Sequence, residues 1–193
     1  IANMQLRLPV VVIGGGLTAI DTATESLAYY TVQVEKFLHR YETLVAERGE
    51  AAARGAWSDE ERAVADEFLA HARAIRDERA EAVKAGRAPD VLSLLRQWGG
   101  VTIAYRRRLI DSPSYTLNHE EVQKALEEGI WFAECLSPTA IDVDAGGAVR
   151  AIRLARQTLG EDGKWSAGGE VELPARSVLV AAGTQPNTVL ARE

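Results

Sequence analysis

The 193-residue sequence contains a single cysteine, Cys135, which excludes an internal disulfide, a redox dithiol and a cysteine-ligated iron–sulfur cluster within this chain. It also has no apolar run near the ~18 residues that span a bilayer. Because no signal-peptide pattern is present either, we expect a cytoplasmic protein without a membrane partner. The net charge of −6 argues against nucleic acid as a partner. Any redox chemistry must therefore come from bound cofactors.

The composition that is present suits a globular domain, with 47% hydrophobic and 26% charged residues. The length fits one domain, which we expect to occupy residues 1–193. The chain starts at Ile1 rather than Met and stops at Glu193, directly after a turn-like TQPN segment. We therefore expect a domain excised from a larger protein. The alternative is a short protein that has lost its first residue.

Short apolar, β-branched runs that lead into glycine or a turn predict strands of a parallel sheet. These strands are expected at residues 9–13, 101–105, 130–133 and 177–182, with a helix at 115–128. From Pro138 onward the pattern alternates apolar and polar residues, which predicts an antiparallel meander over 140–143, 149–156 and 170–173. The order of elements predicts an α/β fold of the Rossmann type: a parallel sheet with helices on one face and a small antiparallel β-meander on the other.

The connection after the first helix is several times longer than a Rossmann crossover needs. Residues 31–98 carry apolar side chains at helical spacing, and Ser58 with Glu61 forms a potential capping box. Pro89 fits the first turn of a further short helix that ends near Gly99. We interpret residues 31–98 as an inserted helical hairpin. It is expected either to pack on its own chain or a neighbouring domain, or to mediate oligomerisation.

A dinucleotide fingerprint follows the first strand. Gly14-x-Gly16-x-x-Ala19 lies where a buried strand ends and a helix opens. Gly14 is expected to permit the tight turn, Gly16 to let a pyrophosphate approach the backbone, and Ala19 to allow close helix–strand packing. The N–H groups of the helix start would face the phosphates. The alternative is a glycine-rich turn with a structural role only.

The residues after the second strand indicate which dinucleotide is bound. An NAD site usually has an acidic residue there for the ribose 2′-hydroxyl. This chain instead has Tyr105 followed by Arg106, Arg107 and Arg108, with no acid before Asp111. Guanidinium groups bind a 2′-phosphate with charge-assisted hydrogen bonds, which favours NADPH over NADH. The alternative is a solvated basic turn.

A third segment, Ala182-Gly183, directly follows the last strand. A glycine there lets the chain pass close to a cofactor, and a plain strand-ending turn is the competing interpretation. The complete set of expected cofactor-binding residues is Gly14, Gly15, Gly16, Leu17, Thr18, Ala19, Tyr105, Arg106, Arg107, Ala182 and Gly183. No catalytic or metal-binding residue is expected, because His39, His71 and His119 are scattered and Cys135 suits a small buried apolar position.

The segments VVVIGGGLTAID, VTIAYRRRLIDSP, EEVQKALEEGIWF and VLVAAGTQPN together resemble the nicotinamide-binding domain of the glutamate synthase small-subunit group. That group belongs to the pyridine nucleotide-disulfide oxidoreductase flavoproteins, which have two dinucleotide-binding domains. The resemblance implies that residues 15–18 line the pyrophosphate, that Arg106 and Arg107 bind the 2′-phosphate, and that the Gly183 turn lies near nicotinamide and flavin. The chain departs from the pattern of this group in two places. Leu17 lies where the group typically has Asn, and residues 31–98 are absent from the usual pattern.

The function expected from this resemblance is to hold NADPH and position its nicotinamide for hydride exchange with FAD. The FAD-binding domain and any iron–sulfur centres would lie elsewhere in the parent protein, with an iron–sulfur protein or another electron acceptor as a further partner. The alternative is a dinucleotide-sensing or protein-interaction module that uses the helical insertion. The final electron acceptor, the direction of electron flow and the oligomeric state stay open.

Overall fold

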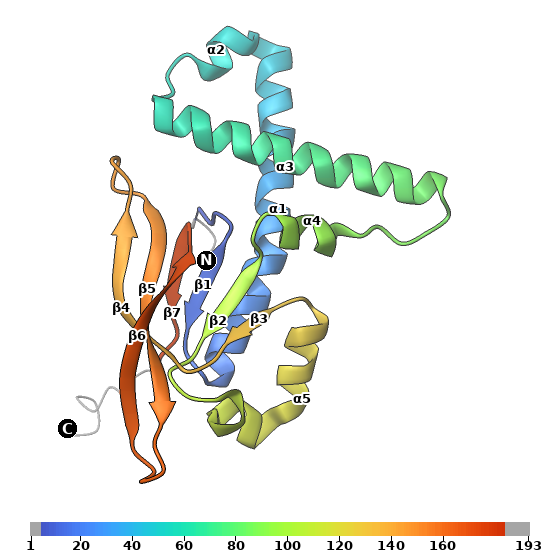
Figure 1. Ribbon diagram of the computed structural model, residues 1–193. Coiled ribbons are helices and arrows are strands. Elements are labelled where there is room, and N and C mark those ends of the chain that lie inside the picture. Colours follow the sequence, from blue (N-terminus) through green and yellow to red (C-terminus); the bar gives the residue numbers. More distant parts are fainter. Residues whose placement is uncertain (1–4, 184–193) are drawn as a thin grey trace, which may run out of the picture.

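The computed structural model describes residues 5–183, which form an α/β fold with one parallel and one antiparallel sheet (Figure 1). The elements in chain order are β1 (Val10–Ile13), α1 (Leu17–Arg48), α2 (Glu50–Arg54), α3 (Asp59–Lys84), α4 (Val91–Gln97), β2 (Val101–Ala104), the 3-10 helix η1 (Leu109–Asp111), α5 (Pro113–Glu127), β3 (Trp131–Ala133), β4 (Leu136–Val143), β5 (Val149–Leu159), β6 (Trp165–Pro174) and β7 (Ser177–Val180). The parallel sheet has the order β3-β2-β1-β7, and the antiparallel sheet has the order β4-β5-β6.

The central strand β1 explains why its sequence is continuously apolar. It pairs in parallel with β2 on one side and β7 on the other. Val10 and Val12 join a core cluster with the helices, whereas Val11 joins a second cluster with the antiparallel sheet. Because both faces of β1 are covered, every position must be apolar. The prediction of helices on one face and a meander on the other is confirmed.

The meander strands are longer than predicted. β4 begins at Leu136, which belongs to the second core cluster together with Ile152 and Leu154 of β5. Away from this buried contact the strands are largely exposed, including Ile141 and Val143 at the end of β4 and Leu159 at the end of β5. The pattern therefore identified the second half of β4, the first eight residues of β5 and a segment near the end of β6.

Strand β7 differs from the expected buried strand. It pairs only with β1 among the described strands, and Val180 at its end is 74% exposed. A strand at the edge of a sheet is covered less completely than a central one, so the apolar run of β7 is half-buried. Residues 184–187, which completed the predicted final turn, lie outside the described residues.

Residue 31, where the predicted insertion begins, lies within α1, which continues to Arg48 as one 32-residue helix. Val34, Leu38 and Tyr41 extend the buried stripe that starts with Ile20 and Leu27. No glycine or proline interrupts this spacing before the helix ends, at a glycine with a φ of 79°. Residues 31–48 are therefore a continuation of the helix that starts after the glycine fingerprint.

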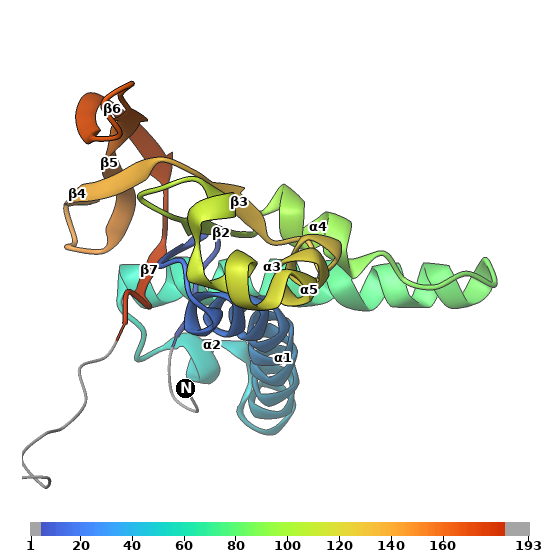
Figure 2. The same cartoon turned by 90° about the horizontal axis from the view of Figure 1, so that it is seen from below.

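The second long helix, α3, crosses α1 instead of lying antiparallel beside it, as Figure 1 and Figure 2 both show. The predicted hairpin is thus a crossed pair, with the short helix α2 in the connection. Helix α3 begins as predicted: Ser58 and Glu61 form the capping box, in which the Ser58 hydroxyl accepts a hydrogen bond from the Glu61 N–H. Pro89 lies before α4, whose N-cap is Asp90.

Residues 31–98, called the helical extension from here on, share one hydrophobic core with the parallel sheet. Phe68 of α3 is 4% exposed and makes edge-to-face contacts with Tyr30 and Phe37 of α1. The same cluster contains Val10 and Val12 of β1. The packing therefore makes α3 part of the domain core. Between residues 5 and 183 no helix is both long and apolar enough to cross a membrane.

We predict that Phe68→Ala lowers the free energy of unfolding by about 3–4 kcal/mol, because it removes a buried aromatic ring and leaves a cavity. Urea unfolding followed by circular dichroism measures this loss. Val83→Ala is the control on the same helix, since Val83 is 81% exposed, and it should change little. Two separate unfolding transitions, or equal losses in both variants, would contradict a shared core.

Candidate functional site

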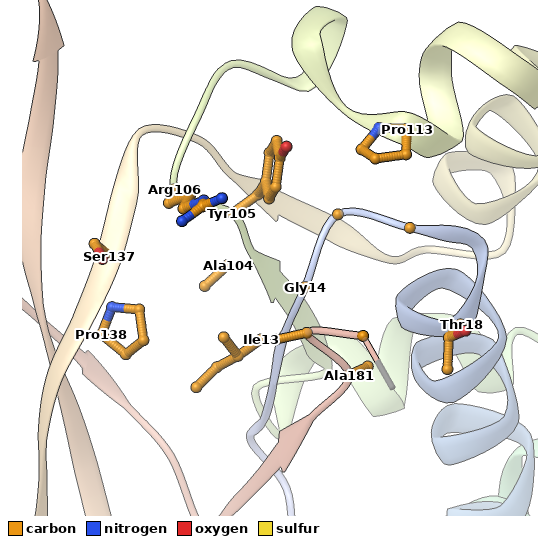
Figure 3. A pocket seen from close by; sticks show the side chains of 14 residues that line it. Ile13, Gly14, Thr18, Ala104, Tyr105, Arg106, Pro113, Ser137, Pro138 and Ala181 are labelled. Carbon is orange, nitrogen blue, oxygen red and sulfur yellow. The ribbon is translucent and has the colours of Figure 1, made fainter. Parts of the chain in front are cut away.

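A cavity of about 500 Å³ lies at the carboxyl ends of β1, β2 and β7 (Figure 3). Ligands of open α/β sheets bind at this edge. Eight predicted site residues line the cavity: Gly14, Gly15, Gly16, Thr18, Tyr105, Arg106, Ala182 and Gly183. The other three lie around it. The Leu17 side chain packs against the core, Ala19 is buried behind the glycines, and Arg107 lines a neighbouring cavity.

Gly14 serves close packing, which corrects its predicted role in a tight turn. A Cβ on Gly14 would lie 2.4 Å from the Ala181 carbonyl oxygen of the segment after β7 and 2.9 Å from the Cβ of Ala19. Its backbone is not in the left-handed region, so the turn itself does not require glycine. The absent side chain instead lets β1, the segment after β7 and α1 approach one another. Ala19 is small for the same reason, as predicted.

Gly15 is covered by residues that follow β2. A Cβ at this position would lie 2.2 Å from the Cε2 atom of Tyr105, so the tyrosine ring lies directly against the Gly15 backbone. The Gly15 carbonyl oxygen accepts hydrogen bonds from the N–H and the hydroxyl of Ser114, at 3.1 and 3.0 Å. Both contacts hold the glycine loop in one position.

Gly16 faces open space and begins α1. It is the N-cap, with φ −96° and ψ 177°, and a Cβ placed on it would meet no atom within 4 Å. No side chain caps the helix, and its first turn contains no acidic residue. The Ala19 N–H donates to the Gly16 carbonyl oxygen at 2.9 Å, so the N–H groups of Leu17 and Thr18 are the ones without a partner within the helix. The cavity therefore contains an uncapped, electropositive helix start beside an empty position that a side chain would fill.

The three arginines after β2 differ in the contacts that their side chains make. Arg108 forms two hydrogen bonds to the Asp111 carboxylate, at 2.7 and 2.8 Å, which hold the pKa of that carboxyl below its usual value. Arg106 and Arg107 are exposed, and in residues 5–183 neither side chain makes a hydrogen bond or ion pair. The arginine cluster thus supplies two available guanidinium groups.

The cavity and its neighbour are lined by cationic and neutral groups. Among the described residues, no aspartate or glutamate lines either one. An anion in either cavity would therefore meet no carboxylate among the lining residues. Sequence reasoning missed Pro113, Ser137 and Pro138, which complete the walls (Figure 3). They come from α5 and β4, and only the tertiary fold brings them to the glycine loop.

The residues that were expected to have no chemical role stay outside the cavity. Cys135 is half-buried, and burial raises the pKa of its thiol above the ordinary value. It adopts a left-handed backbone conformation, with φ 56°. His71 stacks on Trp98 with ring centroids 3.7 Å apart, and burial lowers its pKa. Within the described part of the chain no cluster of three potential metal ligands is found.

No family model matches the sequence. The chain is 37% identical over 156 residues, or 81% of its length, to the uncharacterized protein RP006 of Rickettsia prowazekii. It is 34% identical over 96 residues, 46% of its length, to the small chain of glutamate synthase [NADPH] of Escherichia coli. It is also 34% identical over 94 residues, 45% of its length, to the putative oxidoreductase AegA of the same organism.

The chain spans a fifth or less of each relative, since the matches cover 20%, 20% and 14% of their lengths. The partial similarity to the glutamate synthase small chain and to AegA supports a relationship to oxidoreductases.

The close packing around Gly14 leads to a prediction about the stability of the fold. Gly14→Ala should lower the free energy of unfolding by about 1–3 kcal/mol, because its methyl group would overlap a backbone oxygen that cannot turn away. Gly16→Ala is the matched control and should cost less than about 1 kcal/mol, as expected for a weak N-cap residue in open space. Chemical denaturation of the two variants measures the difference. Equal losses would contradict the separate roles of these glycines.

Proposed function

We propose that this chain is the NADPH-binding domain of a flavin-dependent oxidoreductase similar to the glutamate synthase small subunit. The observation that carries the proposal is one cavity in which an uncapped helix start lies beside the unpaired Arg106. Partial homology to the small chain of glutamate synthase [NADPH] supports the same conclusion. The parent protein's other domains would hold FAD and pass electrons to an iron–sulfur centre or another acceptor, in the cytoplasm.

The pyrophosphate fits at the glycine loop. Gly16 leaves its position open, and the start of α1 offers backbone N–H donors with the positive end of the helix dipole. Thr18 lines the same wall and adds a hydroxyl group. Leu17 contributes backbone only, because its side chain packs against the core. This placement is compatible with Leu17 at a position where the resembling group typically has Asn.

The 2′-phosphate fits at Arg106 and Arg107. Their side chains are exposed, and in residues 5–183 they form no hydrogen bond or ion pair, so binding a phosphate breaks none. Arg107 interacts with the Asp111 carboxylate only through the electrostatic field. Asp111 is the nearest acid in the sequence after them, and its charge is already paired with Arg108. The local field therefore attracts an anion.

The nicotinamide fits at the other end of the cavity, near Ala182 and Gly183. Gly183 has a φ of 108°, which only glycine adopts readily, so the chain can turn there beside the ligand. When bound, NADPH supplies the hydride that is exchanged with FAD. The chain's own residues bind and orient the dinucleotide, and none of those lining the cavity is needed as an acid or base.

We predict that Arg106→Ala combined with Arg107→Ala weakens NADPH binding by roughly tenfold to a hundredfold, the cost of losing charge-assisted hydrogen bonds. NADH binding should change less than about threefold, because NADH lacks the phosphate. Isothermal titration calorimetry of the purified chain with each nucleotide measures both. Arg40→Ala with Arg73→Ala is the matched control, since it removes two exposed arginines from α1 and α3. Equal weakening of NADPH and NADH would contradict the 2′-phosphate assignment.

A second prediction concerns the helix start. Gly16→Ser should retain or raise the stability of the fold, because serine is a better N-cap than glycine. The same hydroxyl would occupy the open position and bond the N–H groups that the pyrophosphate needs. NADPH binding should therefore weaken by roughly tenfold or more. Thermal unfolding measures the stability of the variant, and calorimetry measures its affinity for NADPH. Unchanged NADPH affinity in a stable variant would argue against the glycine loop as the phosphate site.

A further inference from the structure

A second cavity, of about 190 Å³, adjoins the first. It is lined by Arg106, Arg107, Ser137, Gln157 and Trp165. Arg106 and Ser137 line both cavities, so the two are neighbours along the loop after β2. The remaining two side chains come from β5 and β6 of the antiparallel sheet. The arginines thus lie between the glycine loop and the meander.

Backbone hydrogen bonds hold the arginine loop against β5. The Cys135 N–H donates to the Arg107 carbonyl oxygen at 3.0 Å, and the Cys135 carbonyl oxygen accepts from the Gln157 N–H at 2.7 Å. The left-handed conformation of Cys135 allows it to bridge the two segments. The second cavity is therefore a fixed part of the fold.

Trp165 is an aromatic residue without an aromatic partner. It lies at the first position of β6, opposite Leu159, and is only half-buried. Among the described residues it takes part in none of the ring–ring or cation–π contacts. In contrast, Trp98 stacks on His71, Trp57 makes a tilted contact with Phe37, and both pack against the core. The turn before it is fixed by the Asp162 carboxylate, which accepts from the Lys164 N–H at 3.1 Å. Trp165 of this hairpin thus lines the cavity that contains the arginines.

We propose that Trp165 is the stacking platform for the adenine base of the dinucleotide. This inference rests on the proposed function and names the subsite that the base would occupy. The base and the 2′-phosphate are carried by adjacent carbons of one ribose, so a phosphate at Arg106 and Arg107 brings the base within reach of the same cavity. Aromatic side chains bind bases through their ring faces.

Gln157 supplies a polar group beside this platform. Its side-chain amide nitrogen donates to the Ala155 carbonyl oxygen at 3.3 Å, which leaves its oxygen as an acceptor. Adenine carries an exocyclic amino group that donates hydrogen bonds. The cavity therefore combines a ring face, an acceptor and two cations, which are the groups that a 2′-phosphorylated adenosine requires. Inorganic phosphate alone would use only the cations.

The platform and the arginines make different contributions. NADPH and NADH share the adenine base, so the Trp165 contact strengthens both by the same factor. The arginines bind the 2′-phosphate, which NADPH alone carries. Substituting Trp165 should therefore lower the affinity for both nucleotides and leave their ratio unchanged.

The test is calorimetric titration of the 193-residue chain and its variants with NADPH, NADH and adenosine 2′,5′-bisphosphate. Trp165→Ala should weaken all three by roughly tenfold, and Trp165→Phe, which keeps a ring face, should stay within about threefold of the unsubstituted chain. Trp131→Ala is the matched control, because Trp131 is 44% exposed on β3 and lies outside both cavities. It should leave every affinity unchanged, and thermal unfolding verifies that each variant is folded.

The outcomes separate this inference from the proposed function. If the unsubstituted chain prefers NADPH but the folded Trp165→Ala variant binds as tightly, the platform is wrong and the proposed function stands. If Trp165→Ala weakens NADPH alone, the indole acts by positioning the arginines, which also overturns the platform. If the unsubstituted chain binds none of the three ligands, the proposed function fails, and the platform fails with it.

Discussion

The candidate site depends on the close approach of three backbone segments at Gly14. The Ala181 carbonyl oxygen and the Ala19 Cβ both occupy the space where a Gly14 side chain would lie. Because β1, the segment after β7 and α1 meet there, α1 starts directly beneath the end of the sheet and its first N–H groups border the cavity. Tyr105 and Ser114 then close over Gly15. The floor of the cavity is therefore backbone, which suits an elongated anionic ligand better than a substrate that needs many side-chain contacts.

The charged side chains around the cavity also suit an anionic ligand. The sequence presents three consecutive arginines, yet the fold commits Arg108 to Asp111 and leaves Arg106 and Arg107 for the cavities. The Arg108–Asp111 pair is exposed, so it contributes little to stability. Its effect is local: it neutralises the acid nearest in sequence to the two available guanidinium groups. The result is a cationic edge on a chain whose net charge is −6.

Local signals predicted the parts of the fold that depend on neighbours in sequence. The apolar run of β1, the helix start directly after the glycine loop and the Ser58–Glu61 capping box each depend on a few neighbouring residues, and each is found where the pattern indicated. The continuation of α1 past residue 31 could also be predicted from the sequence, because no helix-breaking residue interrupts the helical spacing before Gly49. The extra length relative to a usual Rossmann crossover was interpreted as a helical insertion that begins at residue 31, and nothing in α1 marks that position.

The parts that sequence reasoning missed depend on contacts between distant segments. Trp165 joins Arg106 and Arg107 only because Cys135 connects the arginine loop to β5. Gly14 looks like a turn residue until the neighbouring carbonyl of Ala181 is seen. Nothing within a few residues of either position encodes these contacts.

The shared core also decides how the purpose of the helical extension can be studied. Tyr30 contacts Phe68 of α3, and its ring also lies near Trp98, the C-cap of α4. Removing residues 31–98 would therefore take away Phe68 and Trp98, whose rings lie near Tyr30, and expose part of the shared core. A deletion would thus change the stability of the domain together with any role of the extension. Exposed positions on α3, such as Val83 at 81% exposure, can be changed while the core is kept. A partner of the extension is thus best sought with surface substitutions that leave α1 and the site intact.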